Sequence, residues 1–143
     1  MRNLLYILLL IFLFSCKKEN PISDIPEIEF ISISPTIVQE FSDEIIITIS
    51  YFDANGDLGE NNPDVENLFV KDNRNEIEYA FRIPELTPTG NEIAIQGNLD
   101  ISLSNTGITD GSNSQTTTFN IYMVDRANHQ SNIVASTPIT IIN

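Results

Sequence analysis

Cysteine, tryptophan, histidine and basic side chains are scarce in this sequence of 143 residues. There is one cysteine, so an intrachain disulfide is excluded. The single histidine, His129, argues against a multi-histidine zinc site and against a histidine-based catalytic triad. Lys and Arg number 7 against 20 Asp and Glu, which gives a net charge of −13. That charge repels nucleic-acid phosphates, so we expect no nucleic-acid partner.

Motifs that carry catalysis are also missing. Gly56 and Gly59 do not form a phosphate loop, because they stand in an acidic segment with the wrong charge for phosphate. The acidic residues are spread over predicted loops and outward-facing positions, whereas a glycosidase pair needs an apolar cleft that raises one pKa. We therefore expect a protein that is not an enzyme.

The N-terminal residues have the pattern of a bacterial export signal. A positive charge at Arg2 is followed by an unbroken apolar run over residues 4–14. This run falls short of the ~20 residues that a membrane-spanning helix needs, but it suits the hydrophobic region of a signal peptide. It ends in Leu13-Phe14-Ser15-Cys16, which resembles the lipobox of bacterial lipoproteins. We predict a signal peptide over residues 1–15.

The lipobox resemblance implies that Cys16 is lipidated and anchors the protein to a membrane. In that family the sulfur gains a diacylglyceryl group and the new amino group an acyl chain, and two or more chains make anchoring stable. An ordinary secretory signal with an incidental cysteine is the alternative. Residues 16–26 are charged, polar and interrupted by proline, so they predict a tether. Residues 17–19 (Lys-Lys-Glu) resemble a surface-export signal of Gram-negative lipoproteins, which implies the outer membrane, facing either the periplasm or the cell surface.

From residue 27 to residue 143 the chain alternates between apolar and polar side chains. Ile77, Tyr79, Phe81 and Ile83, for example, alternate with polar or small residues. This is the pattern of strands with one face on a core and the other in water. Segments rich in Gly, Pro, Asn, Asp and Ser separate the alternating stretches. We predict seven strands, at residues 27–33, 44–52, 67–72, 77–84, 93–103, 116–125 and 134–142.

Seven short strands with this spacing predict an all-β fold, a seven-stranded immunoglobulin-like β-sandwich. Residues 124–132 resemble a strand end found in many bacterial immunoglobulin-like modules. The Cys…Trp…Cys core of antibody domains is absent, so the resemblance is to the wider group that includes cadherin-like and fibronectin-III-like domains. Together with Cys16, it implies a small immunoglobulin-like lipoprotein of a Gram-negative envelope.

One acidic segment, residues 53–64, predicts a calcium site. Asp53, Asn55 and Asp57 place oxygen ligands at alternate positions, which resembles the first half of an EF-hand or dockerin loop. If the strand order is right, Asp125 begins a loop at the same end of the sandwich and lies near them. The alternative is turn chemistry alone, since Asp, Asn and Gly are also the standard turn residues.

Two functions from different classes fit these features. The first is a structural or interaction module that docks on another envelope protein. The second is an accessory lipoprotein that captures a glycan or other nutrient for an uptake system. Phe52 and Tyr122 lie on the outward parity of their strands, and exposed aromatic side chains of this kind would favour the second function. A contiguous apolar patch would favour the first.

Overall fold

The protein is described by a computed structural model that covers residues 23–90 and 92–143. The predicted signal peptide (residues 1–15), Cys16 and most of the tether lie outside the described residues. Within these two ranges all regular secondary structure is β-strand. No helix in them is long and apolar enough to cross a membrane. The all-β prediction is therefore confirmed.

Ten strands make up the described chain. In order, these are β1 (Glu27–Ser34), β2 (Ile37–Gln39), β3 (Ile45–Asp53), β4 (Leu68–Asp72), β5 (Glu78–Phe81), β6 (Ile95–Leu103), β7 (Ser114–Thr117), β8 (Phe119–Met123), β9 (Val134–Ala135) and β10 (Ile139–Ile142).

Alternation along β3 shows why these residues form strands. Ile45, Ile47 and Ile49 are buried, while Thr48 and Ser50 between and beyond them are only partly covered. A β-strand sends successive side chains to opposite faces, so the β-branched residues of one parity fill the core and the polar ones meet solvent. The same alternation of buried and half-buried positions runs along β4, β8 and β10.

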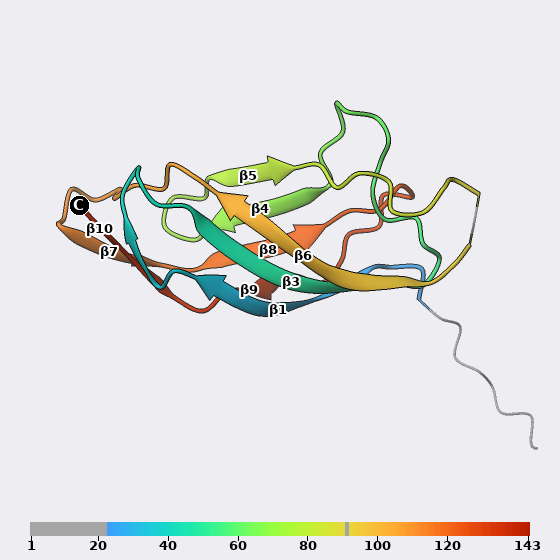
Figure 1. The fold of residues 1–143 in the computed structure, drawn as a ribbon, viewed down its shortest axis with the longest axis horizontal. Helices are drawn as coiled ribbons and strands as arrows, with labels where there is room; N and C mark the ends of the chain where they lie inside the picture. The colour runs from blue at the N-terminus through green and yellow to red at the C-terminus, as the bar shows by residue number, and fades with distance from the viewer. Residues whose placement is uncertain (1–22, 91) are drawn as a thin grey trace, which may run out of the picture.

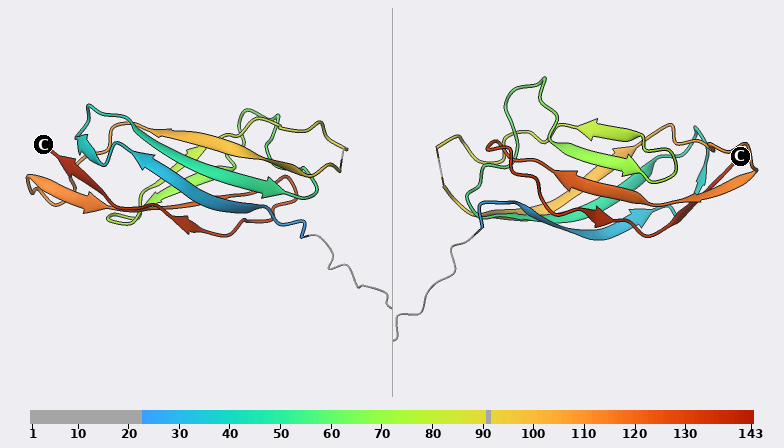
Figure 2. Two further views of the ribbon diagram at one scale, coloured as in Figure 1. Left: turned by 60° about the horizontal axis from the view of Figure 1, so that its bottom comes forward. Right: turned by 180° about the vertical axis from the view of Figure 1, so that it is seen from behind.

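The strands pair into three sheets. One has the order β1-β3-β6, the second β5-β4-β8-β9 and the third β2-β10-β7. Figure 1 shows β1, β3 and β6 in front of β4, β5 and β8, and Figure 2 shows the same two layers from other sides. One core cluster joins Ile47 and Ile49 of β3 to Val70 of β4 and Ile121 of β8, all fully buried. The arrangement is compatible with a β-sandwich.

The structure has more strands than the seven predicted, because the chain changes sheets within two predicted ranges. Thr117 pairs with Ile139 in one sheet, whereas Phe119 pairs with Asp72 in another, so the range 116–125 contains the end of β7 and all of β8. The range 134–142 likewise contains β9 and β10. The short strand β2, parallel to β10, lies outside every predicted range.

Three loops meet at one end of the sheets, where the described chain also begins (Figure 1). The register sets this placement: Glu27 at the start of β1 lies opposite Phe52, near the end of β3. The end of β3 lies opposite the start of β6, and the start of β4 lies opposite the end of β8. The loops 54–67, 82–94 (without residue 91, which is not described) and 124–133 therefore lie together, and we call this region the acidic end.

Candidate functional site

The acidic loop after β3 is fixed by its first residue and by a buried leucine. Asp53, the last residue of β3, is fully buried, and its Oδ2 accepts a hydrogen bond of 2.8 Å from the N–H of Leu58. Leu58 is also fully buried and belongs to the core cluster. Gly56 between them has φ +72, and a Cβ there would stand 2.1 Å from the carbonyl oxygen of Ile93. The loop is thus folded back tightly on the segment just before β6.

Arg126 connects this loop to the loop after β8. Its backbone N–H donates to the carbonyl oxygen of Asp57 at 3.1 Å. Its guanidinium donates to the carbonyl oxygens of Gly59 at 2.9 Å and Gly56 at 3.3 Å. The sequence predicted that these two loops share one end, and the structure brings them into direct contact. The role of Arg126 was not predicted, because a lone arginine in a loop has no distinguishing pattern.

Asp125 lies within the loop after β8 and is bound to His129. Only 5% of its surface is exposed. Its Oδ1 accepts the backbone N–H of His129 at 2.8 Å, and its Oδ2 stands 3.1 Å from the Nδ1 of the same residue. His129 thus satisfies one hydrogen bond at each oxygen of this buried carboxylate and closes the loop.

Three buried side-chain oxygens in the acidic loop receive no hydrogen bond from the described residues. They are the Oδ1 atoms of Asp53, Asn55 and Asp57. Buried polar atoms in native proteins nearly always have a partner, and each exception calls for an explanation such as an ion or an ordered water. All three belong to the residues that the sequence singled out as calcium ligands.

Electrostatic repulsion accompanies this burial. Desolvation raises the pKa of the Asp57 carboxyl, and the nearby charges of Asp125 and Asp53 raise it further. Arg126 and His129 lower the same pKa, but they do not cancel the increase. The carboxylates of Asp53 and Asp125 are therefore close enough to Asp57 to oppose its ionisation. No group of three or more His, Cys, Asp or Glu side chains in the two described ranges could by itself hold a metal ion.

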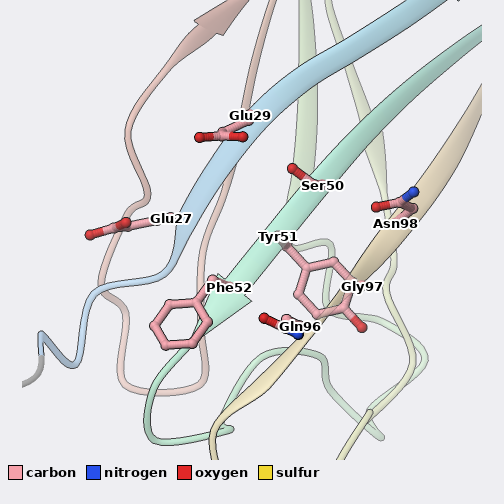
Figure 3. Close-up of a pocket in the computed structure, with 8 residues that line it drawn as sticks. All are labelled: Glu27, Glu29, Ser50, Tyr51, Phe52, Gln96, Gly97 and Asn98. Carbon is pink, nitrogen blue, oxygen red and sulfur yellow. The ribbon is translucent and has the colours of Figure 1, made fainter.

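A polar groove crosses the outer face of the β1-β3-β6 sheet near the same end. In Figure 3, Phe52 and Ser50 of β3 lie between the glutamates of β1 and the side chains of β6. The residues that line the groove are Glu27, Glu29, Ser50, Tyr51, Phe52, Gln96, Gly97 and Asn98. The volume is about 410 Å³. Phe52 is 40% exposed there. The sequence predicted the exposure of Phe52 but not the groove, which depends on the register between three strands.

A second, apolar groove lies between β6 and the end of β5. Its lining includes Leu68, Phe81, Ile83, Leu99 and Ile101, and its volume is about 200 Å³. Among the described strands β6 pairs only with β3, so its other edge is open over nine residues. The groove therefore runs beside an unpaired strand edge. Sequence analysis did not foresee this, because alternation does not tell which strand ends a sheet.

Tyr122, the other aromatic residue expected to face outward, is held by its neighbours. Its ring stacks on Phe69 with centroids 4.9 Å apart, and its hydroxyl donates to Glu78 at 3.0 Å. The pairing of β4 with β8 places Phe69 directly opposite Tyr122. This aromatic pair is a cross-strand contact within the sheet.

Comparison of the chain with protein-family models, curated proteins and solved structures found no match.

Proposed function

We propose that this chain is a lipid-anchored, immunoglobulin-like β-sandwich module of a Gram-negative outer membrane, and that it is not catalytic but docks on another envelope protein. The lipobox ending at Cys16 supports the anchor. The sandwich-like packing of the sheets and the strand end at residues 124–132 support the immunoglobulin-like assignment. The described domain begins at the acidic end, so a tether attached to Cys16 would hold that end nearest the membrane.

The observation that carries the docking proposal is the open edge of β6. Within residues 23–90 and 92–143, no strand pairs with this side of the nine-residue β6, whereas proteins usually keep edge strands short, twisted or covered. An extended segment of another protein can add to such an edge through main-chain hydrogen bonds, while adjacent pockets take alternate side chains. The apolar groove formed by Leu99, Ile101 and Phe81 would receive those side chains.

The chemistry of the occupant follows from the same surface. Apolar side chains at every second position would fill the groove, because side chains of an added strand alternate between its two faces. The net charge of −13 favours a partner segment with Lys or Arg at the intervening positions. The occupant is therefore an extended, basic segment of an envelope protein.

Site-specific photo-crosslinking of the full-length lipoprotein in intact cells tests this proposal. A photo-reactive residue is placed in turn at Gln96, Asn98 and Asp100 of β6, with Ile133, which is 58% exposed elsewhere, as the control. The expected result is crosslinks from the three β6 positions to one segment of one protein, advancing by two residues at each step. Crosslinks to scattered proteins, or equal yield from Ile133, would contradict strand addition.

The second candidate function, capture of a glycan, is favoured by the polar groove of Figure 3. An exposed aromatic ring beside carboxylates and amides suits a sugar, whose C–H face packs on the ring and whose hydroxyls bind the polar groups. Phe52, Glu29 and Gln96 supply these groups. Titration of the protein with a panel of oligosaccharides tests it: binding by the native protein that is lost in Phe52→Ala supports capture, and the absence of any binding contradicts it.

A further inference from the structure

We propose that the acidic loop binds one Ca²⁺ ion through the Oδ1 atoms of Asp53, Asn55 and Asp57. This site is independent of the docking function. It rests on where the structure places three oxygen atoms, each of which is buried and receives no hydrogen bond from the described residues.

The first argument is the burial of Asp53. Its side chain is fully buried, so water does not freely solvate its charge. One oxygen is satisfied by Leu58, but the other has no donor. Burying a charged oxygen without a partner is costly, and such groups are normally paired or coordinate a metal. Asp53 therefore needs a positive partner on its Oδ1 side.

The second argument is the balance of charge at the acidic end. Among the carboxylates there, those of Asp53 and Asp125 lie close to that of Asp57, and both are almost completely buried. The guanidinium of Arg126, which lies near Asp57, donates to main-chain carbonyl oxygens and also stands 3.7 Å from Glu85. No described hydrogen bond joins Arg126 to any of the three carboxylates. A divalent cation would supply the missing positive charge.

The third argument is the type and spacing of the ligands. Ca²⁺ takes six to eight hard oxygen ligands, including carboxylates, amide oxygens and water, in a flexible arrangement. Two carboxylates and one amide at alternate positions of a single loop supply three, and water molecules and main-chain carbonyls would complete the set. Asp125 is turned toward His129, so it acts as a neighbouring charge and not as a direct ligand.

The position of the site gives the ion a structural task. The loop that would hold it packs against Arg126 of the loop after β8 and against Ile93 before β6. Bound Ca²⁺ would therefore fasten two loops to the end of β3, at the end of the sheets where the described chain starts. We expect an affinity of about 10⁻⁴–10⁻³ M, as in extracellular calcium modules.

Calorimetric titration and thermal unfolding of the full-length protein in detergent test the proposal, with CaCl₂, MgCl₂ and EDTA as the conditions. At about 10 mM Ca²⁺ and a dissociation constant of about 10⁻³ M, the folding equilibrium constant rises about tenfold. Asp57→Asn and Asn55→Ala should each abolish the calcium effect. Asp64→Asn, an exposed acid in the same loop, is the matched control and should retain it.

Asp57→Asn also separates a cation ligand from a turn residue. If Asp57 is a ligand, the difference in stability between CaCl₂ and EDTA disappears in this variant. If it is only a turn residue, the substitution changes stability by the same amount in both conditions. The proposal is overturned if native curves in Ca²⁺ and EDTA coincide, if Mg²⁺ has the same effect as Ca²⁺, or if the calcium effect persists in Asn55→Ala.

Discussion

Arg74 and Asp72 form an ion pair that is almost completely withdrawn from solvent. The Nη2 of Arg74 stands 2.6 Å from the Oδ2 of Asp72, and their side chains are 8% and 0% exposed. The same guanidinium donates to the carbonyl oxygen of Gly107 at 2.9 Å and to the Oε1 of Gln115 at 2.8 Å. The turn between β4 and β5 is thereby fastened to β7 and to the loop before it.

Substitution of Arg74 by alanine should be strongly destabilising. It leaves the charge of Asp72 buried and unpaired, and breaking a buried pair in this way costs about 3–5 kcal/mol. Urea unfolding followed by circular dichroism measures the loss. Lys71→Ala is the control, because Lys71 forms a solvent-exposed pair with Glu76, and its unfolding midpoint should hardly move. Equal effects of the two substitutions would contradict this interpretation.

The same pair predicts a dependence of stability on pH. Burial opposes ionisation of Asp72, but hydrogen bonds from Arg74 and Thr117 outweigh it and hold the pKa below its ordinary value of 3.8. The folded state thus gains stability above 3.8 and loses it as the pH falls through the lower, folded pKa. The native protein should exceed Asp72→Asn in stability most at neutral pH, and the difference should shrink below about pH 4. If the difference in stability between the two proteins does not change with pH, the predicted role of the Asp72 charge is wrong.

Gly59 should tolerate no side chain. Its φ is +85, and a Cβ would stand 2.2 Å from the carbonyl oxygen of Pro84. Gly111 also has a positive φ, +74, but a Cβ there would meet no atom within 4 Å. Gly111→Ala should cost about 1–2 kcal/mol from backbone strain alone, and Gly59→Ala about 1–3 kcal/mol more from the clash. Chemical unfolding of the two variants measures the difference, and equal losses would exclude the clash.

Asn132 should hold the start of β1 in place. Its Oδ1 accepts the N–H of Ile28 and its Nδ2 donates to the carbonyl oxygen of Ile28, both at 2.8 Å. Asn132→Asp replaces the donor with a charged acceptor, so we expect a loss of about 1–3 kcal/mol. Hydrogen exchange at the Ile28 amide should accelerate. Asn128→Asp, at an exposed position in the same loop, is the control, and hydrogen exchange at the Ile28 amide should stay slow in it. Faster exchange in both variants would contradict the role of Asn132.

The sequence predicted the all-β class because burial leaves a direct trace in it. Ile45, Ile47 and Ile49 are spaced two apart, and each is fully buried. It also predicted that Asp53 and Asp125 lie at the same end, from the place of their two loops in the strand order expected for a sandwich.

The remaining features depend on long-range pairing, which alternation does not encode. The groove at Phe52 exists because Phe52 lies opposite Gln96 and Glu27, residues distant in sequence. At the break after Thr117, the hydroxyl of Thr117 donates to the buried carboxylate of Asp72 at 2.8 Å, and Phe119 continues into the other sheet. Neither contact alters the local residue pattern, so neither could be read from it.

Intact-mass spectrometry of the mature protein, extracted from membranes, tests the central claim that this domain is anchored by lipid at Cys16. The account predicts a mature chain that begins at Cys16 and carries the added mass of a diacylglyceryl group and an acyl chain. The Cys16→Ser variant should no longer be found in the membrane fraction. A mature chain with an unmodified Cys16, or a Cys16→Ser variant that stays with the membranes, would contradict it.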